Sequence, residues 1–294
     1  MRVTQTMINR SMIRSISESK ENLSVVQNQI SSGKKITDVS DDPVGFIRSN
    51  NYKNYIINNE EYIDNISDGI GWMEMTYGVL DEVYELVVDA RDRSIQGADE
   101  VSGGFQRTIL SGEIDSILKS VLALSNTSYQ DKHIFAGTQT IGDKPFTMDE
   151  NDNVVYDGNS EAITRRIYEN YDITINMAGD ELLDSGVFEN LKILKDALAN
   201  GDIDAISSSI TNLDETSNSL MSSIAHINSI KNQADMTRVR LETANINLAS
   251  YISDTEDTDM AEAIARYGVE EMSYKAALQT TSDAINLNIL DYLR

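Results

Sequence analysis

The feature that most constrains this fold is an apolar residue at every seventh position over the stretch 206–248. The positions are Ile206, Leu213, Leu220, Ile227, Ala234, Leu241 and Leu248, with Ile203, Ile210, Ser217 and Ile224 expected at the companion positions. A heptad sustained for this length is typical of a long helix that packs in a coiled-coil-like way. We therefore expect a mainly helical, rod-like chain.

A second long helix is expected to begin at Pro43, directly after Asp41 and Asp42. An Asp at the cap with Pro at the first helical position is a strong start signal. Its apolar seam contains Tyr52, Ile56, Ile63, Ile66, Ile70, Met73, Tyr77, Leu80, Tyr84 and Val87, with Asn59 as the polar member. Three glycines lie inside this helix, and we interpret them as sites of close helix approach: Gly69, Gly71 and Gly78.

Between the long helices the periodicity changes from helical to alternating. A shorter helix is expected to end near Tyr129. After it, apolar and polar side chains alternate over 163–167 and again over 173–177. Gly and Asn turns separate these runs, a pattern that favours antiparallel strands. Helix is expected again from about Val187 to Leu198. The sequence therefore predicts a small antiparallel β insertion over residues 133–179.

Both ends of the chain carry amphipathic stripes. The first helix is expected over about residues 4–32, with Gly33 as its stop, and Tyr267 opens the apolar stripe of the last one. Such stripes form a seam that needs a partner helix. The predicted assembly seam consists of Met12, Ile16, Leu23, Val26 and Ile30 at one end, and Tyr274, Leu278, Ile285, Ile289 and Tyr292 at the other.

A terminal helix of about 30 residues is expected to be marginal when isolated. About six apolar side chains contribute roughly 9–18 kcal/mol when fully buried. Ordering the same segment costs at least roughly 30 kcal/mol in backbone entropy. We therefore predict that residues 1–35 and 260–294 are mobile in the free monomer and become ordered on assembly.

The order of elements is symmetrical about the β insertion, which indicates nested, discontinuous domains. We expect a terminal helical assembly domain (1–35 and 260–294), a rod of long helices (36–132 and 180–259) and the inserted β domain (133–179). The expected fold class is mainly α with a small β insertion, with both termini helical and adjacent.

Charge and composition exclude several classes of partner. The net charge of −24 disfavours nucleic acid and anionic membrane surfaces. The chain contains no cysteine, so disulfide and thiolate chemistry are excluded. Its apolar runs are too short for a membrane span, and its N-terminus lacks the apolar core of a cleavable signal peptide. Composition by itself thus indicates a cytoplasmic protein.

Few residues are suited to catalysis, so we expect no enzyme, cofactor or metal. The two histidines, His133 and His226, lie far apart in the sequence without a matched nucleophile or ligand set. The acidic loop 149–153 lacks the glycine and the bidentate Glu of an EF-hand calcium loop, so we interpret it as a solvated turn. The acidic run 254–259 is interpreted as a cap for the last helix.

Three groups of residues resemble signatures of the flagellin superfamily. The first group is Gln29-Ile-Ser-Ser-Gly-Lys-Lys-Ile36 with Ser40-Asp-Asp-Pro43. The second group is Ile134-Phe-Ala-Gly-Thr138. The third group, near the C-terminus, is Asp257-Thr-Asp-Met-Ala-Glu-Ala263 with Tyr274-Lys-Ala-Ala-Leu-Gln279 and Leu290-Asp-Tyr-Leu293. Proline at 43, where flagellins more often have alanine, is more similar to the hook-associated protein 3 branch. The motifs cover both ends of the chain and the entry to the β insertion, whose interior matches least.

The resemblance implies a structural protein of the bacterial flagellum that joins the hook to the filament as a ring. It implies hook-associated protein 1 and flagellin as neighbours, and an export chaperone on the C-terminal helix. It also implies export through the flagellar type III apparatus without a cleavable signal, which replaces the cytoplasmic location indicated by composition.

Two other interpretations stay open at this point. A flagellin that forms the filament itself is the first alternative, and the Asp-Asp-Pro form and the small insertion weigh against it. A helical-bundle binding module is the second, and it lacks a membrane span or a clustered polar pocket in the sequence.

Overall fold

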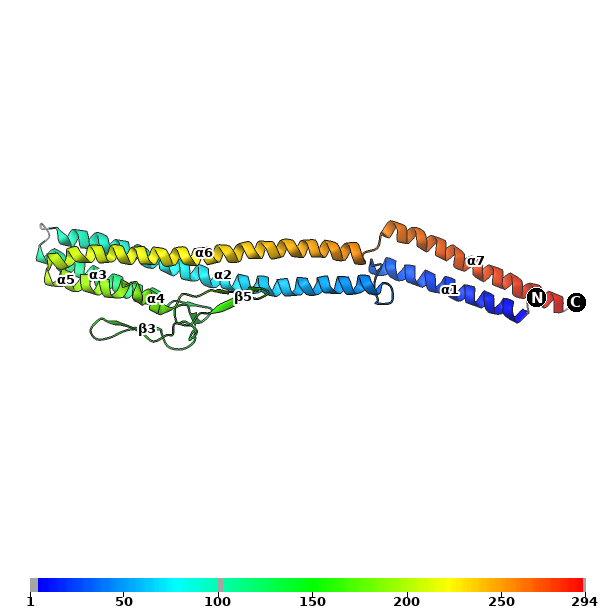
Figure 1. Ribbon diagram of the computed structural model, residues 1–294, viewed down its shortest axis with the longest axis horizontal. Helices are drawn as coiled ribbons and strands as arrows, with labels where there is room; N and C mark the ends of the chain where they lie inside the picture. Colours follow the sequence, from blue (N-terminus) through cyan, green and yellow to red (C-terminus); the bar gives the residue numbers. More distant parts are fainter. Residues whose placement is uncertain (1–4, 100–102, 293–294) are drawn as a thin grey trace. The chain divides into compact units, whose positions relative to one another are not determined.

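The computed structural model describes residues 5–99 and 103–292, with side chains for 7–99 and 103–283. Its helices are α1 Gln5–Ser32, α2 Pro43–Ala98, α3 Gly104–Ser125, α4 Gly179–Asp184, α5 Val187–Asn200, α6 Ile203–Glu256 and α7 Met260–Tyr292. The expected fold class, mainly α with a small β insertion, is confirmed (Figure 1). None of the helices in the described part of the chain has a stretch long and apolar enough to cross a membrane.

The contacts divide the chain into two compact units. The terminal unit comprises residues 1–58 and 244–294, and the central unit comprises residues 59–243. Both boundaries fall inside helices, so α2 and α6 each contribute to both units. The three-part division expected from the sequence places its boundaries elsewhere and stays a prediction.

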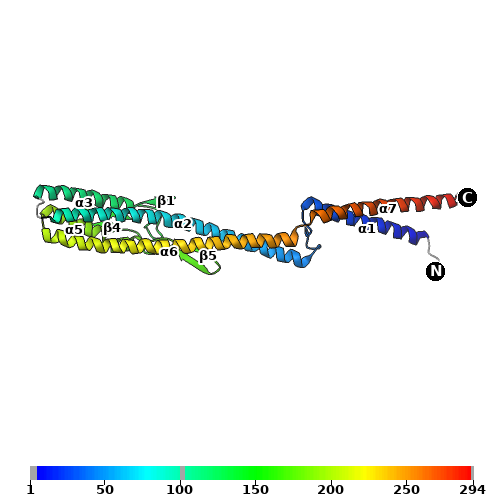
Figure 2. The same ribbon diagram turned by 90° about the horizontal axis from the view of Figure 1, so that it is seen from above.

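The core of the central unit is the predicted heptad seam of α6. Ile206, Leu213 and Leu220 are 0% exposed, and the seam stays buried as far as Leu241. Parts of α2 and the helices α3 and α5 pack against it (Figures 1 and 2). Complete burial of a Leu or Ile side chain contributes about 1.5–3 kcal/mol, so this repeat is a main source of stability.

Among the companion positions of the seam, Ile210, Ser217 and Ile224 are half-buried and Ile224 packs against the core, so only the first position differs from the prediction. Ile203 is 40% exposed, whereas Ser209 and Thr216, each three residues after a seam position, are buried. The Ser209 hydroxyl donates to the Ala205 carbonyl at 2.9 Å, so the buried oxygen is hydrogen-bonded within its own helix. Buried polar residues thus lie beside the companion positions, which an apolar pattern does not reveal.

The β insertion consists of three antiparallel two-stranded pairs. The strands are β1 Ser128–Tyr129, β2 Lys132–His133, β3 Phe146–Met148, β4 Val154–Tyr156, β5 Thr164–Tyr168 and β6 Tyr171–Thr174, paired β1–β2, β3–β4 and β5–β6. Phe146 is buried between Tyr156 and Phe188, with ring centroids 5.1 and 5.5 Å away. Phe188 belongs to α5, so this aromatic cluster attaches the insertion to the helices.

The glycines of α2 are only partly as predicted. A Cβ at Gly69 would lie 3.0 Å from Ile175, and one at Gly71 would lie 2.5 Å from the Tyr129 hydroxyl. Both glycines therefore allow a close approach, but to the β insertion instead of to another helix. Gly78 has nothing within 4 Å of the Cβ position, so the prediction of a close approach there is wrong.

The terminal unit contains α1 and α7 side by side, as both views in Figures 1 and 2 show. Helix α1 ends where the sequence predicts, because Gly33 has a φ of 71°, a left-handed conformation that favours glycine. Helix α7 begins after a cap by Asp259, whose Oδ1 accepts from the amides of Ala261 and Glu262 at 2.8 and 3.2 Å. The prediction of a cap in the acidic run is confirmed.

Candidate assembly site in the terminal unit

The predicted seam of α1 lies on one side of that helix. Val26 is 1% exposed, and the other four positions are half-buried: Met12, Ile16, Leu23 and Ile30. The alternating spacing of four and three residues places these side chains on one face, which is the face that a partner helix covers. Most of their surface is already covered within the chain, and a smaller part stays exposed. A role of these residues in assembly stays a prediction.

On α7 the inward face is shifted from the predicted one. Ala263 is 3% exposed, and Tyr267 and Tyr274 are half-buried, whereas Leu278 is 42% exposed. Ala277, one residue earlier, is half-buried instead. Apolarity alone selected the leucine, although the small alanine fits the inward position. The remaining predicted seam residues, Ile285, Ile289 and Tyr292, lie outside the residues whose side chains are described.

Two linkers meet beside this helix pair, and their backbones form a short antiparallel bridge. One linker follows α1, and the other joins α6 to α7. The Lys35 amide donates to the Glu256 carbonyl at 2.6 Å, and the Thr258 amide donates to the Gly33 carbonyl at 2.9 Å. Lys34 and Asp257 lie opposite each other in this bridge. Backbone pairing therefore ties together two segments that are distant in the sequence.

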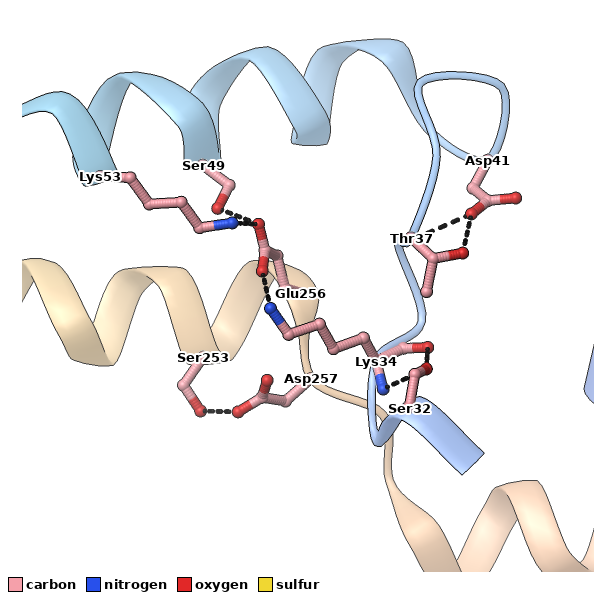
Figure 3. A network of polar contacts seen from close by, with 9 residues as sticks. All are labelled: Ser32, Lys34, Thr37, Asp41, Ser49, Lys53, Ser253, Glu256 and Asp257. Carbon is pink, nitrogen blue, oxygen red and sulfur yellow. Dashed lines mark hydrogen bonds and ion pairs between the residues drawn. The ribbon is translucent and has the colours of Figure 1, made fainter. Parts of the chain in front are cut away.

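The carboxylate of Glu256 lies at the centre of this junction (Figure 3). It accepts from Lys34 Nζ at 2.8 Å, from Ser49 Oγ at 2.5 Å and from Lys53 Nζ. The Glu256 side chain is 4% exposed, whereas the two lysine side chains are 44% and 42% exposed. We call this group, Lys34, Ser49, Lys53 and Glu256 with the backbone bridge, the linker clasp.

Burial and hydrogen bonding act in opposite directions on Glu256. Burial by itself would raise the pKa of this carboxyl, but the bonds from Lys34, Lys53 and Ser49 together lower it to about 2. The Glu256 hydrogen bond also raises the pKa of Lys34 above its usual value. The clasp is therefore a charge-assisted network that favours an ionised carboxylate at neutral pH.

The loop between α1 and α2 is held by its own aspartates. Asp41 Oδ2 accepts from the amides of Thr37 and Asp38 at 2.9 and 3.0 Å, and these bonds lower the pKa of the Asp41 carboxyl. Asp42 Oδ1 accepts from the amides of Val44 and Gly45 at 3.1 and 3.0 Å. Asp42 is thus the cap of α2, as predicted, and Asp41 closes the preceding turn.

The clasp is the part of the site that sequence reasoning missed. Glu256 belongs to the acidic run 254–259, which was interpreted only as a helix cap. Lys34 belongs to residues 1–35, which hold six basic residues and two acidic ones, and it is separated from Glu256 by 222 positions. The signal available in the sequence was the opposite charge of the basic segment 1–35 and the acidic run 254–259. No local periodicity connects these two segments.

The other candidates for chemistry lie apart from this site. His133 is in β2, with Nδ1 3.2 Å from the Asn126 carbonyl oxygen, and His226 is exposed on α6. Asp149 Oδ1 accepts from the amides of Asn151 and Asn153, both at 2.8 Å, which confirms the predicted turn. Across the described residues, no three His, Cys, Asp or Glu side chains are grouped so that they could hold a metal ion.

Comparison with known proteins agrees with the motifs found in the sequence. Residues 3–140 match the family model of the bacterial flagellin N-terminal helical region. Flagellar hook-associated protein 3 of Escherichia coli K12 is 20% identical over 98% of this chain and 98% of that protein. A flagellin of Brucella melitensis biotype 1 is 22% identical over 96% of this chain and 95% of the flagellin.

Solved structures show the same fold. A putative flagellar hook-associated protein from Vibrio parahaemolyticus has a TM-score of 0.67 at 20% identity, covering 74% of this chain and 100% of that chain. The flagellar junction protein FlgL from Legionella pneumophila has a TM-score of 0.54 at 14% identity, covering 73% of this chain and 99% of that chain. The resemblance expected from the motifs is confirmed over most of the chain.

Proposed function

We propose that this chain is the structural protein that joins hook to filament in the bacterial flagellum. Its residues 3–140 match the flagellin N-terminal helical region, and its fold is that of flagellar hook-associated proteins. The observation that carries this proposal is the likeness to hook-associated protein 3 along nearly the full length of both chains. The Asp41-Asp42-Pro43 start of α2 supports the same branch of the family.

The terminal unit supplies the assembly element in this proposal. The part of the α1 and α7 seam that stays exposed binds neighbouring subunits, and the copies close into a ring. The linker clasp fixes the two linkers to each other, so that force on one terminal helix reaches both α2 and α6. The central unit, with its continuous heptad core, then acts as a stiff lever that passes torque.

The proposed neighbours follow from the position of such a ring. Hook-associated protein 1 lies on the hook side, and flagellin lies on the filament side. A flagellar export chaperone covers the C-terminal helix before export, because its apolar stripe would otherwise be exposed in the cytoplasm. The chain leaves the cell through the flagellar type III apparatus, without a cleavable signal, and stays at the hook–filament junction. The role is structural, without catalysis.

Deletion of the gene tests the proposal. We expect intact hooks, flagellin secreted into the medium without polymerising, and no attached filaments under the electron microscope. Return of the gene should restore attached filaments and swimming. Attached filaments of normal length in the deletion strain would refute the proposed role.

The alternative is a flagellin that forms the filament itself, and the observation behind it is the 22% identity to the Brucella flagellin. Stoichiometry separates the two roles. A junction protein is present as a short ring in each flagellum, whereas a flagellin extends along the whole filament. Immunogold labelling of isolated flagella should therefore mark one band at the hook end, and labelling along the filament would support the alternative.

A further inference from the structure

Among the exposed apolar residues in the described part of the terminal unit, one group lies at the start of α2. Val44, Ile47 and Tyr55 are 65%, 59% and 59% exposed. Their spacing of three and eight residues places them on one side of the helix. The segment 43–59 also contains no acidic residue, although the whole chain has a net charge of −24. Its exposed cation Arg48 forms no ion pair within the described part of the chain.

The second face is the outer side of α7. Ile264, Val269 and Met272 are 58%, 58% and 66% exposed. Val269 and Met272 lie on the side opposite the half-buried Tyr267 and Tyr274, and Ile264 lies on the flank of the same exposed face. The seam predicted for α1 and α7 faces the other helix of the pair. The outer face of α7 is a separate surface that α1 does not cover. Apolar side chains of this size on one exposed face are typical of a binding surface.

Small side chains and charge make the outer face of α7 complementary to the start of α2. Ala265 and Ala276 are exposed on the same side and leave room for bulky groups such as Ile47 and Tyr55. Glu262 flanks this face and, like Arg48, has no ion pair among the described residues. Arg48 and Glu262 therefore have opposite signs, and Glu262 can pair with Arg48, while the exposed Arg266 lies one turn further along α7. Such complementarity selects a partner and fixes its register.

We propose that the start of α2 in one copy of this chain binds the outer face of α7 in the next copy. The two faces differ, so the contact is heterologous, and each copy offers one face to each neighbour. Contacts of this kind generate a ring when the rotation closes and a helical array when it does not. The inference rests on the proposed assembly function, and it identifies a contact outside the seam between α1 and α7.

Cysteine cross-linking of the full chain tests the contact, because the natural sequence has no cysteine. The double variant Ile47→Cys, Met272→Cys should form a ladder of disulfide-linked oligomers when concentrated and oxidised. A mixture of the two single variants should stop at dimers. Each single variant alone should stay monomeric, since the contact joins unlike faces. Dimers of a single variant, or no ladder from the double variant, would overturn the proposal.

Charge reversal gives an independent measurement on the same cross-linkable chain. Arg48→Glu or Glu262→Arg alone should lower the cross-linking rate about threefold to tenfold, the effect of turning one surface attraction into repulsion. The two reversals together should restore the rate. Glu18→Arg, elsewhere on the exposed surface of the terminal unit, is the matched control. If the double reversal failed to restore cross-linking, the pairing of Arg48 with Glu262 would be contradicted. Circular dichroism verifies that each variant is helical.

The outcomes separate this contact from the proposed function. Filaments that attach normally in cells expressing Arg48→Glu, with no ladder in solution, would refute the contact and leave the junction role intact. A thiol at Ile47→Cys that reacts freely with a maleimide under conditions where the chain self-associates would indicate that the α2 face is free for a different protein. That result would also overturn the proposal.

Discussion

Neutralising Glu256 should loosen the linker clasp, and the structure gives the size of the effect. The pKa of this carboxyl falls from 4.5 to about 2 in the folded chain. A fall of about 2.5 in pKa corresponds to about 3 kcal/mol of folding free energy, at about 1.4 kcal/mol for each pKa unit. The Glu256→Gln variant should lose a stabilisation of this order at pH 7, because the amide cannot match two ammonium groups and a hydroxyl.

The dependence on pH has a definite sign. A carboxyl whose pKa is lower in the folded state contributes stability that is fully present above its unfolded pKa. That stability is lost as the pH falls from about 5 towards 2, since protonation then accompanies unfolding. The difference between the natural chain and Glu256→Gln should therefore be largest at neutral pH and close to zero near pH 2.

Hydrogen exchange at two amides measures this effect directly. The amides of Lys35 and Thr258 donate across the bridge, so they exchange only when the clasp opens. At pH 7, Glu256→Gln should lower their protection factors roughly a hundredfold, which is the equivalent of about 3 kcal/mol. Glu21→Gln, an exposed carboxylate on α1, is the control and should change them little.

Two results would refute this reasoning. If the loss of protection in Glu256→Gln were the same at pH 2 and pH 7, ionisation of Glu256 would not be its cause. If neither amide were protected in the natural chain at pH 7, the clasp would not form in the free monomer. The second result would also extend the mobility predicted for the terminal segments to their linkers.

Three further predictions concern stability. Leu213→Ala should lower the free energy of unfolding by about 2–5 kcal/mol, measured by urea unfolding of the full chain. Ile203→Ala, at a 40% exposed position, should lower it by less than about 1 kcal/mol. Equal losses would contradict the assignment of the seam. Gly137→Ala should destabilise the folded chain by several kcal/mol, because φ at this position is 64° and the new Cβ would meet the Asn159 backbone oxygen. Gly112→Ala, where the Cβ would point into open space, should stabilise the chain by about 0.5–1 kcal/mol. Thermal unfolding compares the two, and a tolerated Gly137→Ala would refute the close contact. Asp42→Ala should cost about 1 kcal/mol and speed amide exchange at Val44, and no change there would exclude the cap.

Local patterns in the sequence determined most of the secondary structure. The heptad of α6 predicted the buried residues from Ile206 to Leu241, because a helix returns to the same face every seven residues. The cap of α2 was equally local, since Asp42 binds amides only two and three residues away. The change to alternating side chains located the β5–β6 hairpin, whereas α3 ends at Ser125 and β1 Ser128–Tyr129 occupies a segment where the helix was expected to end. Each of these features depends on neighbours along the chain.

Finer choices within a helix face were beyond such patterns. Hydropathy selected Leu278 and Ile203 as inward residues, yet both are exposed, and next to Leu278 it is the small Ala277 that is half-buried. A neighbouring helix decides which row of side chains it covers, and a small residue often fits best where the approach is closest. Gly78 shows the same limit, because a glycine that permits close packing cannot be distinguished by sequence from one that faces open space.

The sequence by itself determined that this chain forms long helices around a small β insertion, with amphipathic segments at both ends. Its periodicities and caps act over a few residues, so they are visible before any folding. Only the tertiary structure decided that Glu256 is buried and ionised against Lys34, 222 positions away, and Lys53. The reason is physical: the pKa and burial of a carboxylate depend on which distant segments surround it, and folding alone brings those segments together.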